Sequence, residues 1–167
     1  MHTHSSLQNL VVHFAIVTIS DTRNAITDKN GLLMQELLQN DSHQVISYEI
    51  MPDEPELITN HVIQLGDRPD VSVIITNGGT GISPRDNTYD AICHLIEKPL
   101  PGFGEIFRLL SYQEIGPRAM ASRAVGGIYK NKLLFALPGS THGVKLGMEK
   151  LILPEIHHLV GQMQGLG

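Results

Sequence analysis

The stretch that most constrains the fold of this chain is an apolar run followed at once by three glycines, within residues 71–86. The run is rich in β-branched residues and is typical of a strand buried on both faces. Gly78, Gly79 and Gly81 remove Cβ atoms where the chain leaves the strand, so backbone N–H groups can approach a ligand closely. In open α/β sheets, ligands bind beyond the carboxyl ends of the strands, and this loop is predicted to lie there.

A turn that only connects the strand to the next helix would explain the same glycines, because short glycine patterns occur often by chance. Two features favour a binding loop. A connecting turn needs one glycine rather than three, and Pro84 places Arg85 and Asp86 directly after the loop. The spacing fits neither the Walker loop nor the dinucleotide fingerprint, so the stretch predicts a phosphate-binding loop of another type.

Length and charge limit the classes of protein to which the chain can belong. Its 167 residues suit a single domain, which we expect to span residues 11–167 after a flexible tail at residues 1–10. The net charge of −5 argues against a nucleic-acid partner. No apolar run approaches the ~18 residues of a membrane span, and the first residues do not resemble a signal peptide. We therefore expect no membrane partner and a cytoplasmic location.

Strand and helix patterns alternate along the chain. Apolar runs predict strands at residues 11–19, 45–50, 125–129 and 133–137, and the alternating pattern of residues 45–50 indicates a strand near a sheet edge. Helical spacing of apolar residues follows most of these runs. Strands that alternate with helices predict a three-layer α/β/α domain with a mostly parallel central sheet. Cys93, the only cysteine, is predicted to be a buried thiol on the apolar side of its helix.

Candidate site residues follow several of the predicted strands and should meet the glycine loop where the carboxyl ends of the strands lie side by side. They are Ser20 and Asp21, then Asp53, then Pro138, Gly139 and Ser140. Asp28 is predicted to cap a helix. For Asp53 two interpretations stay open: it caps the following helix, or it reaches Asp86 and shares a metal ion with it and a phosphate substrate.

Six segments taken together resemble the MogA/MoaB family of molybdenum-cofactor biosynthesis proteins, and most closely its bacterial MoaB branch. They are residues 20–21, 52–54, 76–86, 102–105, 119–124 and 137–140, and the resemblance extends over about residues 11–159 in order. It implies a domain like the G domain of gephyrin, assembled as a homo-oligomer, a trimer or hexamer. It also implies molybdopterin as ligand and, in active members, adenylylation of its terminal phosphate with ATP and Mg²⁺, releasing pyrophosphate.

The resemblance also implies roles for individual residues. Asp53 and Asp86 match the acidic pair of metal-assisted adenylyl transfer, and would be the catalytic residues and the Mg²⁺ ligands. The remaining matched positions would bind substrate or nucleotide: Ser20, Asp21, Thr76, Gly78, Gly79, Thr80, Gly81, Arg85, Ser122, Arg123, Pro138, Gly139 and Ser140. Asn87 stands where the family usually has Val, and Thr141 where Pro is common, which weakens the role of Ser140.

The chemistry of this reaction agrees with the residues present. A phosphate monoester has a second pKa near ~6, so at neutral pH it is already a dianionic nucleophile that needs positioning rather than a strong base. Mg²⁺ and loop amides would offset the repulsion between two anions. Two alternatives remain: a catalytically silent protein that binds molybdopterin or a nucleotide, and a structural oligomerisation module. Two carboxylates beside an anionic ligand favour catalysis over binding alone.

Overall fold

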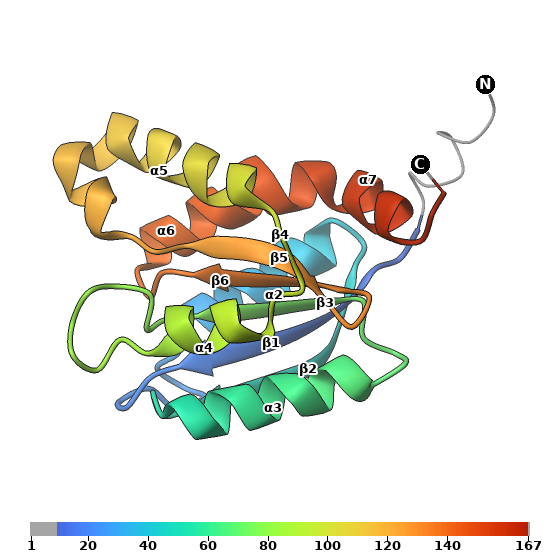
Figure 1. The fold of residues 1–167 in the computed structure, drawn as a ribbon, viewed down its shortest axis with the longest axis horizontal. Coiled ribbons are helices and arrows are strands. Elements are labelled where there is room, and N and C mark those ends of the chain that lie inside the picture. Colours follow the sequence, from blue (N-terminus) through green and yellow to red (C-terminus); the bar gives the residue numbers. More distant parts are fainter. Residues whose placement is uncertain (1–9, 167) are drawn as a thin grey trace.

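A computed structural model describes residues 10–166, and the predicted tail lies almost wholly outside the described residues. The chain forms a six-stranded sheet between two layers of helices, which confirms the predicted α/β/α fold (Figure 1). The strands, in chain order, are β1 (His13–Ile19), β2 (Gln44–Met51), β3 (Val73–Asn77), β4 (Lys98–Pro99), β5 (Val125–Tyr129) and β6 (Lys132–Leu137).

The order of strands in the sheet is β2-β1-β3-β6-β5-β4. The pairs β1–β2, β1–β3 and β3–β6 are parallel, whereas β5–β6 and β4–β5 are antiparallel. β5 and β6 are joined by a tight hairpin at Lys130 and Asn131, both of which have positive φ angles. The sheet is therefore mostly parallel, as predicted, and β2 forms one edge.

Helices cover both faces of the sheet. They are α2 (Lys29–Asn40), α3 (Pro55–Asp67), α4 (Thr88–Leu95), α5 (Pro101–Ile115), α6 (Thr141–Gly147) and α7 (Leu153–Met163), with a 3₁₀ helix η1 (Gly116–Ala121) and a π-helical turn η2 (Met148–Ile152). Helices α2, α6 and α7 pack on one face, and α3 and α4 pack on the other. α5 packs against β5 and against α6 (Figure 1). Among the described residues, no helix is both long and apolar enough to cross a membrane.

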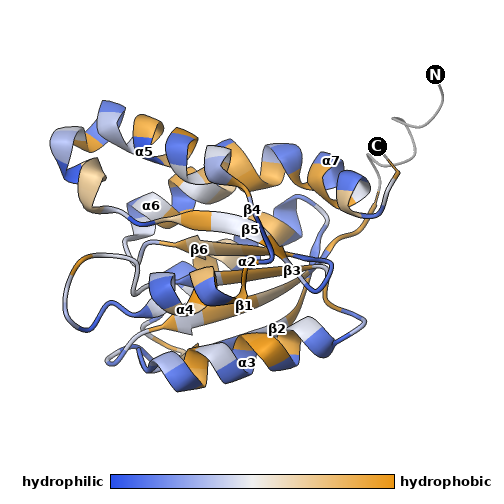
Figure 2. Cartoon of the chain, viewed as in Figure 1, coloured by the Kyte–Doolittle hydropathy of each residue, from blue (hydrophilic) through white to orange (hydrophobic). Residues whose placement is uncertain are grey.

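Successive residues of the central strands are buried on opposite faces, which explains their continuous apolar runs. On β1, Phe14 and Ile16 pack toward α2 and α7, whereas Ala15 and Val17 pack toward α3. Figure 2 shows the result as mainly orange central strands between helices that carry both orange and blue residues. With both faces of the central strands buried, only the strand ends and the loops remain to build a site.

Three local predictions need correction. Asp28 stands at the N-cap position of α2, as predicted, but its side chain makes no capping hydrogen bond and accepts from Thr18 instead. Asp53 does not cap α3, because Glu54 occupies that position and Asp53 accepts from the Asn87 amide. Cys93 is only partly buried and lines a surface pocket, rather than being a buried core thiol. The two aspartates instead bond to segments distant in sequence, which capping patterns cannot reveal.

Candidate active site

Four parallel strands bring the predicted site residues to one edge of the sheet. Ser20 follows β1, Asp53 follows β2, Gly78 follows β3 and Gly139 follows β6. Backbone hydrogen bonds tie these ends together, because the Ser20 amide donates to the Met51 carbonyl and the Gly78 amide donates to the Leu137 carbonyl. Residues separated by more than a hundred positions in sequence therefore surround a common rim.

The glycine loop lies directly against both predicted catalytic carboxylates. A Cβ atom on Gly79 would lie 2.3 Å from Asp53 Oδ2 and 2.2 Å from Thr88 Oγ1. A Cβ atom on Gly81 would lie 2.8 Å from Asp86 Oδ2. Gly78 and Gly79 also have φ angles of 104° and 65°, which favour glycine. The glycines are thus required by the close approach of the backbone to two acidic side chains.

Asp53 is buried, 6% exposed, and interacts with the segment that carries Asp86. Its Oδ1 accepts a hydrogen bond from the Asn87 amide at 3.2 Å. Burial raises the pKa of Asp53, and the nearby charges of Asp86 and Asp21 add to this effect. Beside it, Thr88 Oγ1 is buried and has no hydrogen-bond partner among residues 10–166. A cation or a ligand donor at this point would stabilise the ionised carboxylate.

Arg85 bridges two loops across the rim. Its guanidinium donates to both carboxylate oxygens of Asp21, at 2.9 and 3.0 Å, and to Glu54 at 2.9 Å. This hydrogen-bonded pair lowers the pKa of Asp21 and raises the pKa of Arg85. Asp21 in turn accepts a hydrogen bond from the Asp53 amide at 3.1 Å. Arg85 is more than half exposed, so an incoming phosphate can compete for it.

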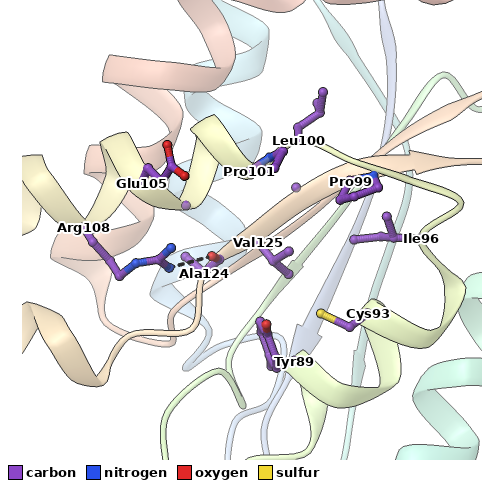
Figure 3. A pocket seen from close by; sticks show the side chains of 12 residues that line it. Tyr89, Cys93, Ile96, Pro99, Leu100, Pro101, Glu105, Arg108, Ala124 and Val125 are labelled. Carbon is purple, nitrogen blue, oxygen red and sulfur yellow. Dashed lines mark hydrogen bonds between the residues drawn. The ribbon is translucent and has the colours of Figure 1, made fainter.

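Arg123 holds the glycine loop in place rather than facing an open phosphate site. Its guanidinium donates to the carbonyls of Gly81 and Asp86, both at 2.9 Å, and pairs with Asp90 at 3.1 Å. Its own amide donates to the Thr80 carbonyl at 3.0 Å. Figure 3 shows Tyr89 on α4, and the Arg123 guanidinium lies 4.7 Å from the centre of this ring.

The other predicted residues divide into those on the rim and those beneath it. Gly139 contacts the glycine loop, since its Cβ position would lie 3.4 Å from Gly78 Cα, and the exposed Ser140 caps α6 by accepting from the Gly143 amide. Thr76 is fully buried inside the sheet and does not reach the rim. Ser122 has a buried Oγ atom without a hydrogen-bond partner in the described chain.

A pocket of about 340 Å³ opens on the other side of Tyr89, between α4 and α5 and over β5. Figure 3 shows Tyr89 and Cys93 on α4, and Glu105 and Arg108 on α5. The remaining lining is largely aliphatic: Ile96, Pro99, Leu100, Pro101, Gly104, Ala124, Val125 and Gly126. Arg108 is anchored to the Ala124 carbonyl at 3.2 Å. The pocket therefore combines apolar walls with a carboxylate and a guanidinium.

Sequence reasoning missed the pocket residues and a set of buried polar side chains at the start of α2. Cys93 and Arg108 gave no separate signal, because both are compatible with an ordinary amphipathic helix. The structure buries Asp28 and Asn30 completely. Their polar side chains at the start of α2 were the one feature of the sequence that could have pointed to a buried hydrogen-bond network. Polar residues at a helix start are common, however, and only the tertiary contacts reveal their partners.

The rim suits a cation that completes its coordination with substrate oxygens. Among residues 10–166, no group of three or more His, Cys, Asp or Glu side chains could hold a metal ion alone. Mg²⁺ is commonly bound through one or two carboxylates together with substrate phosphates. The buried carboxylate of Asp53, whose pKa is raised, fits that mode of binding together with Asp86.

Comparison with known proteins identifies the family. Residues 15–158 match the model of a family described as a probable molybdopterin binding domain. The chain is 49% identical to molybdenum cofactor biosynthesis protein B of Bacillus cereus over 153 residues, covering 91% of this chain and 90% of that protein. It is 47% identical to the protein of the same name from Staphylococcus aureus, covering 98% and 99%.

Solved structures agree with these sequence matches. A crystal structure of molybdenum cofactor biosynthesis protein B has 48% identity and a TM-score of 0.91, covering 93% of this chain and 98% of that one. The tungsten cofactor synthesizing protein MoaB from Pyrococcus furiosus has 33% identity and a TM-score of 0.83, covering 92% and 98%. The extent of these matches and the shared fold show that this chain belongs to the MogA/MoaB family of molybdenum-cofactor biosynthesis proteins.

Proposed function

We propose that this protein binds molybdopterin and adenylylates its terminal phosphate with ATP and Mg²⁺, releasing pyrophosphate. The observation that carries the proposal is that one glycine loop lies against both Asp53 and Asp86. The loop amides can contact phosphates, and the carboxylates can hold a cation. These two kinds of group are thus adjacent on the rim. Membership of a family described as molybdopterin-binding supplies the pterin partner.

The reaction requires two anions to be held together rather than a strong base. An oxygen of the terminal phosphate of molybdopterin attacks the α-phosphorus of ATP, the bond from that phosphorus to the β-bridging oxygen breaks, and pyrophosphate leaves. At neutral pH the attacking phosphate has already lost its proton. Loop amides at Gly78 to Gly81 would orient the phosphates, and Arg85 would exchange Asp21 and Glu54 for phosphate oxygens.

Asp53 and Asp86 would hold Mg²⁺, which neutralises charge on the leaving pyrophosphate when bound. The raised pKa of Asp53 supports this assignment, because burial and the charges of Asp86 and Asp21 outweigh the lowering effects of Arg85 and the Asn87 amide. The nearest guanidinium, that of Arg85, is directed to Asp21 and Glu54 instead. The chain thus leaves Asp53 in an environment that an added cation would improve.

The pocket beyond Tyr89 is where we place the pterin ring. One edge of a pterin carries an amino group and a ring N–H, and both can donate hydrogen bonds to a carboxylate such as Glu105. The neighbouring carbonyl of the pterin can accept a hydrogen bond from Arg108. The aliphatic walls would cover the ring faces. Arg123 and Tyr89 join this pocket to the glycine loop, so a ligand could extend from one to the other.

We also propose that the protein acts as a homo-oligomer, a trimer or hexamer. The outer side of α5 and the adjoining η1 expose large apolar side chains: Ile106, Leu109, Tyr112, Ile115 and Met120, between 47% and 84% exposed. A stripe of this kind on one helix is typical of a protein interface. Light scattering of the purified protein measures the molecular mass of the assembly. Leu109→Arg places a charge within the apolar stripe and should lower that mass toward the mass of a monomer.

The proposal is tested by incubating the protein with molybdopterin, ATP and Mg²⁺ and measuring pyrophosphate and adenylylated pterin. Asp53→Asn and Asp86→Asn should abolish product while pterin binding persists. Binding of molybdopterin without turnover under any divalent metal would refute the adenylyltransferase and identify a catalytically silent binding protein instead. Glu105→Gln should weaken pterin binding without changing the affinity for ATP, which separates the pocket assignment from the reaction.

A further inference from the structure

Asp28 is a fully buried carboxylate to which the proposed reaction gives no role. Its Oδ2 atom accepts hydrogen bonds from Thr18 Oγ1 at 2.6 Å and from the Tyr48 hydroxyl at 2.7 Å. Its Oδ1 atom lies 3.6 Å from Arg23 Nη1 and has no hydrogen-bond partner among the described residues. A buried charge with this many neighbours is costly to retain unless it organises them.

The carboxylate is the end of a directed chain of hydrogen bonds that starts at the exposed Thr141 and is buried from Asn30 onward. Thr141 Oγ1 donates to Asn30 Oδ1 at 2.8 Å, and Asn30 Nδ2 donates to Asn77 Oδ1 at 3.2 Å. Asn77 Nδ2 then donates to Thr18 Oγ1 at 2.8 Å, and Thr18 donates to Asp28. Because an ionised carboxylate only accepts, it fixes the direction of every donor along the chain.

Two branches of this network converge on one backbone carbonyl at the rim. Asn30 Nδ2 and Arg23 Nη2 both donate to the Gly139 carbonyl, each at 2.8 Å. Gly139 in turn lies against Gly78 of the glycine loop. Side chains from α2 and from the loop between β1 and α2 therefore hold the turn between β6 and α6 against the loop that would contact phosphates.

We propose that Asp28 is a positioning residue for the nucleotide site: it fixes Arg23 and the Gly139 turn, and through them one wall of the phosphate-binding loop. The side-chain oxygen of an asparagine at this position could still accept hydrogen bonds from Thr18 and Tyr48. Its NH₂ group, however, would face the Arg23 guanidinium, and two donor groups cannot bond to each other. Arg23 would then leave Gly139, and the turn would loosen. The effect on ATP rests on the proposed function, whereas the effect on the turn does not.

The test compares wild type with Asp28→Asn and Arg23→Met by amide hydrogen exchange and by ATP titration. Exchange of the Gly143 amide, which is bonded to Ser140 at 3.1 Å, should accelerate at least about tenfold in both variants. Amides within β3 should keep their protection. The Kd and the KM for ATP should rise about tenfold, while kcat at saturating ATP changes by less than about threefold.

Arg23→Met guards against a variant that fails to fold, because it removes only a partly exposed side chain and leaves Asp28 with both hydroxyl donors. Tyr48→Phe is the matched control: it removes a donor to Asp28 that is not itself bonded to Asn30, Arg23 or Gly139, so Gly143 exchange and ATP affinity should stay near wild type. Unchanged Gly143 exchange in Asp28→Asn overturns the proposal, and so does unchanged ATP affinity in a protein that binds ATP. If wild type binds no ATP, the proposed function fails, and exchange alone decides the positioning role.

Discussion

Asp28 and Asp53 are both buried aspartates at the carboxyl-terminal edge of the same sheet, but their surroundings differ. Asp28 is neighboured by two hydroxyl donors and a guanidinium supplied by the chain itself. Asp53 has one amide donor and lies among other carboxylates, and its pKa is raised by burial and by the charges of Asp86 and Asp21. One buried charge is balanced within the fold, and the other is not.

This difference separates a structural carboxylate from one suited to a ligand. A buried charge without compensation lowers stability, so a chain that retains one leaves room for a cation or substrate to supply the balance.

Asp53→Asn and Asp86→Asn should each reduce adenylyl transfer about a hundredfold to a thousandfold, because removing a group that stabilises transition-state charge costs about 3–4 kcal/mol. Turnover with molybdopterin, ATP and Mg²⁺ measures this loss. Asp70→Asn, in a surface pair with Arg68 remote from the rim, is the control and should retain activity. Comparable losses in all three variants would contradict a special role for the rim pair.

Gly79→Ala should lower the free energy of unfolding by at least about 2 kcal/mol. The new methyl would combine a positive φ angle with contacts of 2.2 Å to Thr88 and 2.3 Å to Asp53. Gly102→Ala provides the control, because nothing lies within 4 Å of its Cβ position. Denaturant unfolding compares the two, and equal stability would mean that the loop is not held against Asp53.

Tyr48→Phe should lower the free energy of unfolding by about 1–2 kcal/mol, because Asp28 loses one of its two hydroxyl donors. Thr22→Val, which also removes a hydroxyl but at an exposed position, should leave stability near wild type. Chemical denaturation of the two variants tests the claim that the chain itself balances Asp28. A neutral Tyr48→Phe would remove the contrast with Asp53.

As pH falls, the free energy of unfolding should change in opposite directions for a carboxyl group whose pKa is raised by folding and for one whose pKa is lowered. Because folding raises the pKa of Asp53, the folded state favours its proton, so wild type should gain stability relative to Asp53→Asn as pH falls from 7 toward 3.8. Asp70, whose pKa is lowered by Arg68, should show the reverse over a lower pH range: the advantage of wild type over Asp70→Asn persists above pH 3.8 and is lost as pH falls further. Unfolding curves at several pH values measure both differences, and equal signs would refute the environment described for Asp53.

Much of the fold follows from local patterns in the sequence. The apolar runs place β1, β3 and β6 correctly, and the alternating residues of β2 place it at the sheet edge. Strand β4 has only two residues, too short for a periodic signal, and was not predicted. The capping roles predicted for Asp28 and Asp53 were wrong, because tertiary partners compete with local capping for the same oxygen atoms.

Spacing and residue type are enough to predict that a glycine loop follows a buried strand and that acidic residues follow neighbouring strands. They do not reveal that Gly79 and Gly81 lie against Asp53 and Asp86, that Arg123 holds the loop, or that Thr18 and Tyr48 bond to Asp28. These contacts join residues far apart in the chain. Their partners are set by strand order and side-chain packing, which no local pattern encodes.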